Sequence, residues 1–240
     1  TGLLGLAAAP AIAYTASWAG WFASAYGYGR NWDQATSSGW RYFIVDSLRS
    51  WWDYQWGVLS FHTGLTTTHP YQSWPWEWPL LQRPVAFFYE SPNACGTAKC
   101  AQAVLGVGTP VIWYGALIAL IALVAWYVAT RDWRAGAVLL TYGVGLLPWV
   151  YYAITDHRTM FLFYMAPIVP FMILALVLAA GLLIGPAKSP RPMRRLVGAS
   201  LSGALVLLAL INFWWLYPVI SADIIHYDDW HRRMLFDRWI

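Results

Sequence analysis

Charged residues are scarce in this chain. Asp, Glu, Lys and Arg make up 11% of its 240 residues, whereas soluble domains carry about 25%. Hydrophobic residues make up 59%, the mean hydropathy is +0.46, and 18 residues are tryptophan. This composition excludes an ordinary soluble domain and indicates an integral membrane protein.

Five long stretches of the chain contain no Asp, Glu, Lys, Arg or His. Each reaches the roughly 20 residues that an α-helix needs to cross a bilayer. They are Leu3–Phe22, Ala101–Thr130, Ala135–Thr155, Thr159–Ala187 and Leu196–Ala222. We expect an all-α membrane fold with five transmembrane helices: one at residues 1–22, and four with an outer tail in residues 110–240. The absence of ionisable side chains inside these stretches argues against an ion-coupled transporter.

The first uncharged stretch has the small residues of a signal peptide, "GLAAAPAIA", but neither a basic region nor an initiating Met precedes it. We therefore expect it to be a transmembrane helix of a longer membrane protein.

The basic residues predict the orientation in the membrane. The links "RDWR" at 131–134 and "PAKSPRPMRR" at 186–195 together carry six basic residues and one acid. By the positive-inside rule both links are cytoplasmic. We therefore expect a plasma-membrane protein whose N-terminus is cytoplasmic and whose residues 23–109 and tail from Asp223 lie outside. Because the basic cluster lies between two membrane spans, it is not expected to bind nucleic acid.

The outer segment begins with an amphipathic pattern over about residues 38–63, with Ser37 or Ser38 as its cap. Its many Trp and Tyr residues favour a helix that lies flat at the headgroup level. An ordinary surface helix packed on the rest of the protein is the alternative.

An aromatic loop over residues 68–95 follows, beginning "THPYQSWPWEWPLLQRP". Its prolines fix φ and remove backbone donors, so this part is expected to be extended and rigid. Trp74, Trp76 and Trp78 alternate, and in an extended chain they would face the same way. They could stack on a sugar or anchor the loop among lipid headgroups.

Two cysteines are the only ones in the chain, Cys95 and Cys100, and both lie in the outer segment. A small disulfide loop is expected in an oxidising compartment. Two free thiols or half of a metal site are the alternatives, and we expect no metal because no Cys or His partner lies nearby.

Four motifs carry a family resemblance: "HPYQSWPWEWPLLQRPVAFFY", "RDWR", "RTMFLFYMAPIVPF" and "HRRMLFDRWI". From about Ala16 to Ile240 the chain resembles the C-terminal membrane region of actinobacterial protein O-mannosyltransferases. The resemblance implies a GT-C-type glycosyltransferase fold and an inverting transfer of mannose at the outer membrane face. The implied donor is polyprenyl-phosphate-mannose, and the acceptor is Ser or Thr of a secreted protein.

The resemblance also implies partners and a missing part. The implied partners are membrane lipid, the secretion translocon and the N-terminal part of the same protein; no cofactor and no metal are implied. The catalytic acidic pair of the family is expected upstream, so these residues alone are expected to be inactive. The adjacent acids Asp228 and Asp229 are interpreted as solvated surface. A transferase of another lipid-linked sugar and a non-catalytic membrane scaffold are the alternatives.

Seven residues are candidates for substrate binding, because they offer aromatic faces, imidazoles or guanidinium groups on the outer side. They are His62, His69, Tyr71, Trp76, Trp78, Arg83 and Arg158. Structural roles are the alternatives: hydrogen bonds of the two histidines within the protein, a Glu77–Arg83 pair, or neutralisation of Arg158 by Asp156 or Glu77.

A phosphate site at helix N-termini is a further hypothesis. Thr109 and Pro110 are expected to open one outer helix, and Thr155 or Asp156 to cap another. Arg158 would then stand in a first helical turn beside the donor phosphate.

Overall fold

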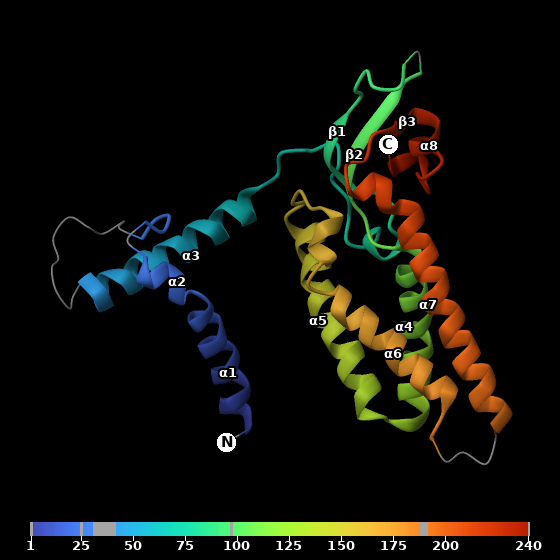
Figure 1. Ribbon diagram of the computed structural model, residues 1–240. Helices are drawn as coiled ribbons and strands as arrows, with labels where there is room; N and C mark the ends of the chain where they lie inside the picture. The colour runs from blue at the N-terminus through green and yellow to red at the C-terminus, as the bar shows by residue number, and fades with distance from the viewer. Residues whose placement is uncertain (1, 25, 31–41, 97, 188–191, 240) are drawn as a thin grey trace. The chain divides into compact units, whose positions relative to one another are not determined.

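The computed structural model describes residues 2–24, 26–30, 42–96, 98–187 and 192–239 (Figure 1). The chain divides into two compact units, Thr1–Leu65 and Thr66–Ile240. Each unit is described by itself below.

Unit 1 is helical. It contains α1 (Gly2–Ser17), α2 (Ala19–Ala23), a π-helical turn η1 (Tyr42–Asp46) and α3 (Ser47–Gly64). The expected first span therefore forms a helix of 16 residues that is interrupted at Trp18. The ring of Tyr14 on α1 lies 6.1 Å from that of Trp51 on α3, so aromatic packing holds α1 and α3 together.

The amphipathic helix predicted at about 38–63 is present as η1 and α3 over residues 42–64. Its expected caps, Ser37 and Ser38, lie outside the described residues.

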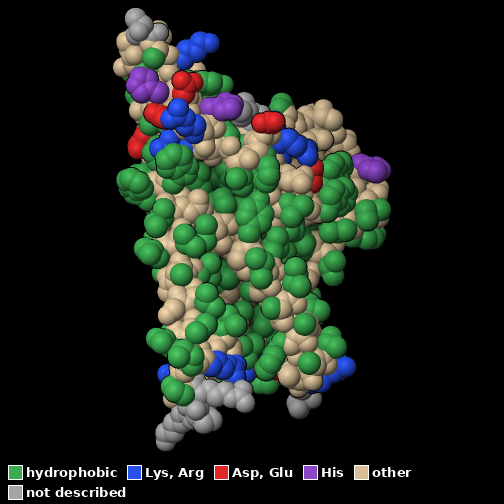
Figure 2. Space-filling model, turned by 90° about the vertical axis from the view of Figure 1, so that its right-hand side faces the viewer, with side chains coloured by type: hydrophobic (Ala, Val, Ile, Leu, Met, Phe, Trp, Pro, Cys, Tyr) green, Lys and Arg blue, Asp and Glu red, His purple; other side chains and the backbone are tan. Residues whose placement is uncertain are grey.

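Unit 2 contains four apolar helices, as expected: α4 (Pro110–Thr130), α5 (Trp133–Thr155), α6 (Val169–Ile184) and α7 (Pro192–Ile220). Within the described residues, three helices of the chain are long and apolar enough to cross a membrane, namely α4, α5 and α7. The mostly helical membrane fold is confirmed. Hydrophobic side chains cover the middle of the face in Figure 2. Lys and Arg stand at the end that carries the α4–α5 and α6–α7 links, and the opposite end shows Lys or Arg together with Asp, Glu and His.

Helix α6 is shorter than the uncharged stretch that predicted it. The chain from Thr159 first runs extended and then forms the 3₁₀ turn η3 (Leu162–Met165). Pro167 follows, and a proline cannot donate the backbone hydrogen bond that would continue a helix. Helix α6 therefore begins at Val169 and ends at Ile184, followed by its C-cap Gly185, which has φ of 75°.

A small antiparallel sheet at one end of unit 2 was not predicted. It consists of β1 (Val85–Glu90), β2 (Cys100–Gly106) and β3 (Ile225–His226), in the order β1-β2-β3. Strand β1 occupies the second half of the expected loop 68–95. Strand β2 was hidden because it lies in the same uncharged stretch as α4, where hydropathy alone does not separate a strand from a helix.

The predicted disulfide is confirmed. Cys95 and Cys100 are bonded across the β1–β2 connection, with their Cα atoms 5.7 Å apart. The tail then returns to the sheet through β3 and continues as α8 (Tyr227–His231) and the 3₁₀ turn η4 (Asp237–Trp239).

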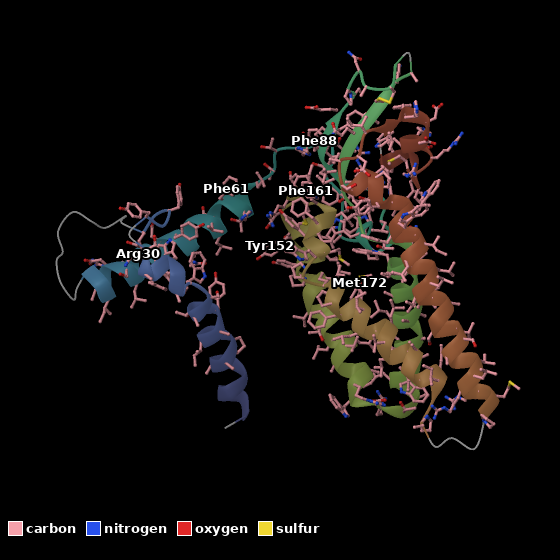
Figure 3. All side chains as sticks on the ribbon, viewed as in Figure 1. Arg30, Phe61, Phe88, Tyr152, Phe161 and Met172 are labelled. Atoms are coloured by element: carbon pink, nitrogen blue, oxygen red, sulfur yellow. A yellow bond between two sulfur atoms is a disulfide. The ribbon has the colours of Figure 1, made fainter. Side chains whose placement is uncertain are left out.

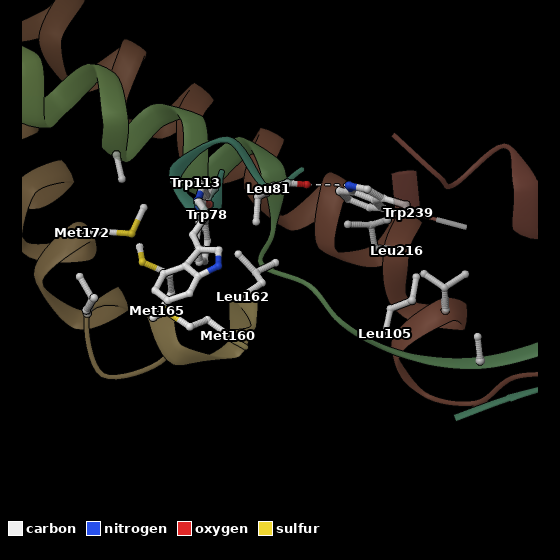
Figure 4. Close-up of a cluster of buried hydrophobic side chains, with 14 of the residues drawn as sticks. Trp78, Leu81, Leu105, Trp113, Met160, Leu162, Met165, Met172, Leu216 and Trp239 are labelled. Atoms are coloured by element: carbon white, nitrogen blue, oxygen red, sulfur yellow. Dashed lines mark hydrogen bonds between the residues drawn. The ribbon is translucent and has the colours of Figure 1, made fainter. Parts of the chain in front are cut away.

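The main core of unit 2 lies where the sheet and the aromatic loop pack against the helices. Trp78 is surrounded there by Met160, Met165 and Met172, and the Leu81–Trp239 contact lies beside it (Figure 4). The aromatic loop is therefore part of the core rather than a cover over it.

Candidate functional site

The aromatic loop is held by indole and phenol donors. Trp78 is fully buried, and its Nε1 donates to Oγ of Ser73 at 2.9 Å. Nε1 of Trp113 donates to the carbonyl of Trp78 at 3.1 Å, and the hydroxyl of Tyr114 donates to the carbonyl of Leu80 at 2.9 Å. A buried loop outside a sheet needs partners for its carbonyls, and these two side chains of α4 supply two of them.

The C-terminal tail fastens the same loop. Nη1 of Arg238 lies 2.6 Å from Oε1 of Glu77, and Nε1 of Trp239 donates to the carbonyl of Leu81 at 2.7 Å (Figure 4). The other oxygen of Glu77 accepts the backbone N–H of Trp74 at 2.8 Å. Glu77 therefore joins two parts of the chain 161 residues apart.

This arrangement corrects the expected Glu77–Arg83 pair. Arg83 instead donates through Nε and Nη2 to the carbonyl of Pro70, and through Nη1 to the carbonyl of Arg238. Sequence reasoning missed Arg238 and Trp239. The available signal was that Glu77 is the only acid in residues 68–84, while the terminal motif is rich in arginine.

The expectation that Trp74, Trp76 and Trp78 face the same way is wrong. Residues 75–77 form a turn rather than an extended strand. Trp74 and Trp76 stack on each other with ring centroids 5.3 Å apart, and Trp76 is 50% exposed. Trp78 points into the core, so the prediction that Trp78 contacts a substrate is corrected: its ring offers no surface to one.

The exposed side of the loop carries an aromatic rim. The ring of His69 lies 5.8 Å from that of Tyr71 and 5.2 Å from that of Phe161, which belongs to the segment after α5. Phe161 stacks on Phe163 at 5.3 Å, and Arg83 lies over the ring of Tyr71 at 5.2 Å. Phe161 is at the end of unit 2 that also carries the sheet (Figure 3). The structure thus brings together His69, Tyr71 and Arg83, with Trp76 exposed on the same loop.

Within the rim, Nδ1 of His69 accepts the backbone N–H of Tyr71 at 3.1 Å. That nitrogen is therefore an acceptor, in agreement with the alternative that His69 forms a hydrogen bond within the protein. The rest of the imidazole is exposed and faces Tyr71 and Phe161.

The expected position of Arg158 in a first helical turn is wrong. Thr155 is the last residue of α5 and Asp156 is its C-terminal cap, so Arg158 follows a helix C-terminus. Arg158 is 6% exposed and lies over the rings of Trp149 and Tyr164 at 5.5 and 5.4 Å. Its Nη2 donates to the hydroxyl of Tyr164 at 3.2 Å.

At the other expected anion site, the start of α4, a protein side chain already accepts a backbone N–H. Thr109 is the N-cap and Pro110 opens the helix as predicted, but the Thr109 side chain makes no capping hydrogen bond among the described residues. The backbone N–H of Val111 donates to Oδ1 of Asn212 on α7 at 3.0 Å.

His62 belongs to unit 1 and is considered by itself. It lies in the last turn of α3 and lines a cavity of about 860 Å³ with residues of the 26–30 turn and of α3. The remaining candidates belong to unit 2.

Asp228 and Asp229 lie in α8. Asp229 pairs with Arg232 at 3.5 Å, with both side chains about half exposed or more. This agrees with their interpretation as surface. In the described part of the chain, no three His, Cys, Asp or Glu residues are grouped as metal ligands.

Residues 47–239 match the family model described as the C-terminal four TMM region of protein-O-mannosyltransferase. The chain belongs to this family. The match covers α3, the aromatic loop, the sheet, all four helices of unit 2 and the tail.

Curated relatives agree with this membership. The chain is 36% identical to the polyprenol-phosphate-mannose–protein mannosyltransferase of Mycolicibacterium smegmatis, 34% to that of Mycobacterium tuberculosis and 31% to that of Corynebacterium glutamicum. Each match covers 96% of this chain but 45% of the relative. The chain thus spans less than half the length of these relatives.

A solved structure shares the fold. The S. cerevisiae protein O-mannosyltransferase Pmt1-Pmt2 complex bound to the sugar donor matches 85% of this chain and 27% of that chain, with a TM-score of 0.62 and 17% identity. This likeness in fold, together with the family match, confirms the GT-C-type membrane architecture expected from the sequence.

Proposed function

We propose that these residues are the C-terminal membrane region of an enzyme that transfers mannose from polyprenyl-phosphate-mannose to Ser or Thr of secreted proteins. The observation that carries the proposal is the identity of 31–36% to relatives of that name over 96% of the chain. The relatives extend beyond the region that this chain matches, and we propose that this further part of the enzyme supplies the carboxylate that acts as general base on the acceptor hydroxyl. Residues 1–240 are therefore proposed to be inactive alone.

The aromatic rim supports a role in holding the acceptor or the mannosyl group. Sugars bind to aromatic faces through their apolar C–H surfaces, and the loop is already ordered by Trp78, Glu77 and the tail. Binding to an ordered loop loses less conformational entropy than binding to a flexible one. We propose that His69, Tyr71 and Trp76 contact substrate.

Arg83 and Arg158 are proposed to act electrostatically rather than as direct phosphate ligands. Both guanidinium groups donate to protein groups and lie over aromatic rings. Their positive charge at this end of the helices favours an anionic donor headgroup nearby, because charges near a low-dielectric membrane are weakly screened.

The test is transfer of labelled mannose to a Ser/Thr acceptor peptide by the full-length protein, with polyprenyl-phosphate-glucose as the control donor. Transfer from the mannose donor alone is expected. Transfer from the glucose donor alone would reassign the sugar, and no transfer from either would favour a scaffold.

The rim is tested in the same assay by Tyr71→Ala and Trp76→Ala, each expected to reduce kcat/KM on the order of tenfold, the effect of about 1.4 kcal/mol. Leu80→Ala is the matched control, since Leu80 is also an exposed apolar residue of the loop. Wild-type rates in both rim variants, with the protein intact in the membrane, would leave the loop a structural element.

The proposed orientation places the two basic links in the cytoplasm of a plasma-membrane protein. In a full-length variant without Cys95 and Cys100, a cysteine introduced at exposed Ser91 should react with an impermeant maleimide in intact cells, whereas one at exposed Ala187 should not. The opposite labelling would reverse the orientation.

Association with the secretion translocon is proposed only because the acceptor must be unfolded. Cross-linking from position 76 during secretion would test it.

A further inference from the structure

Two apolar grooves meet at one arginine on the basic side of unit 2. The larger, of about 610 Å³, lies between α4, α6 and α7. The smaller, of about 300 Å³, lies between α6 and α7. Both are lined by Leu183, Arg194 and Leu201, and all their other lining residues are small or apolar apart from Ser202.

A close helix contact lies in the wall of the smaller groove. Gly198 of α7 is buried, and a Cβ at this position would lie 2.8 Å from backbone atoms of Ile184 on α6. The two backbones therefore touch at Gly198, as small residues allow between membrane helices. Because Leu183, Arg194 and Leu201 line both grooves, the two grooves adjoin at Arg194.

Arg194 is exposed and fixed in place. Its Nη2 donates to the carbonyl of Leu182 at 2.7 Å and its Nε to that of Leu183 at 3.4 Å, at the C-terminus of α6. A guanidinium carries five N–H donors in a fixed fork, so these two bonds orient the group while further donors remain for an anion.

The two links on this side of unit 2 are basic in sequence. The links 131–134 and 186–195 contain six basic residues and the single acid Asp132. Asp132 pairs with Arg134 at 2.7 Å, and hydrogen bonding from Arg134 holds the pKa of that carboxyl below its ordinary value. Basic pockets between helices on this side of a membrane favour lipid phosphates.

The length of the larger groove fits one leaflet. Along α4 it runs from Gly115 to Trp126, which at 1.5 Å per residue is about 16 Å. Half of a hydrocarbon core of about 30 Å is 15 Å, so the groove extends from the basic side to about the middle of the bilayer.

We propose that this place binds an anionic diacyl phospholipid of the leaflet on the basic side. One acyl chain lies in each groove, and Arg194 binds the phosphate. Two grooves that share one cation in their lining match two chains joined at one headgroup, whereas an isoprenoid phosphate has one chain. A protein helix is disfavoured as the occupant because it would cover one groove and leave the cation without an anion.

The test uses the full-length protein in detergent and measures binding of dioleoyl phosphatidylglycerol and dioleoyl phosphatidylcholine by native mass spectrometry. Wild type should prefer the anionic lipid on the order of fivefold, the effect of one arginine at a membrane surface. Arg194→Gln should abolish the preference and Arg194→Lys should retain it. Arg134→Gln, which removes a charge already paired with Asp132, should leave it unchanged.

The grooves are tested separately by Ala122→Phe, which fills the larger one, against Ala125→Phe, an exposed position of α4 that does not line it. The first should weaken binding of both lipids and the second neither. Equal binding by Ala122→Phe and Ala125→Phe, or equal loss in Arg194→Gln and Arg134→Gln, would overturn the proposal. So would a photoreactive residue at position 122 that cross-links in the membrane to protein rather than to lipid.

Discussion

Two tryptophan-rich segments of this chain use the same residue in opposite ways. In α3, Trp52 and Trp56 are 67% and 63% exposed within unit 1. In the aromatic loop, Trp78 is fully buried and its indole N–H is bonded to Ser73. A regular helix satisfies its own backbone and leaves one face for the surroundings. A proline-rich loop leaves backbone carbonyls unsatisfied, and here indole and phenol groups bind them.

The comparison suggests different roles for the two segments. The exposed tryptophans of α3 are suited to a membrane interface, where the ring is apolar and the N–H is hydrated. In the aromatic loop, the buried Trp78 fixes the conformation of a segment whose outward side carries His69, Tyr71 and Trp76. Density of tryptophan in the sequence therefore does not by itself indicate a binding surface.

The largest expected effect is on stability. Trp78→Ala should lower the free energy of unfolding by about 3–5 kcal/mol, because it leaves a core cavity and removes the indole N–H that donates to Oγ of Ser73. Trp76→Ala on the same loop should change it by about 0.5 kcal/mol or less. Denaturant unfolding of the full-length protein in detergent measures both. Similar losses for the two variants would break the distinction between the buried and exposed tryptophans.

A smaller effect is expected from the tail. Glu77 is nearly buried and its hydrogen bond with Arg238 is charge-assisted, so a Glu77→Gln, Arg238→Gln double-mutant cycle should give a coupling of about 1–2 kcal/mol. The matched cycle is Asp229→Asn with Arg232→Gln, an exposed pair expected to give about 0–1 kcal/mol. Equal couplings would mean that the Glu77–Arg238 pair fastens the loop to the tail no more strongly than an exposed surface pair would.

The smallest stability effect is expected in α3. Trp52→Ala and Trp56→Ala should each change the unfolding free energy by about 0.5 kcal/mol or less, because both rings are exposed. Each ring should instead report the membrane interface. In proteoliposomes of full-length protein, bromine placed near the headgroups should quench its fluorescence more than bromine near the chain ends. Quenching by neither lipid would favour the ordinary surface helix over the interfacial one.

Much of the architecture was predictable from local sequence. The apolar stretches predicted α4, α5 and α7, and the spacing of apolar residues predicted α3. The two cysteines predicted the disulfide, because a separation of five residues in an outer segment permits a short loop. Hydropathy and helical period are properties of residues close in sequence, so they can be determined without knowledge of the tertiary structure.

The family followed from longer motifs, which carry more information than composition. The aromatic loop was also correctly expected to begin outside a helix, because three of its prolines lie within ten residues. The sheet was missed because β2 and α4 share one apolar stretch, and only the pairing of β2 with β1 and β3 distinguishes them.

The sequence by itself determined which stretches are apolar, where the basic links lie and which motifs identify the family. The tertiary structure decided which tryptophan is buried, that Glu77 binds Arg238 and that Arg158 packs on Trp149 and Tyr164. Each of these depends on segments that meet only after folding, as Glu77 and Arg238 do across 161 residues. No local periodicity encodes such a meeting, because burial and packing choose among the many partners that a charged or aromatic side chain could take.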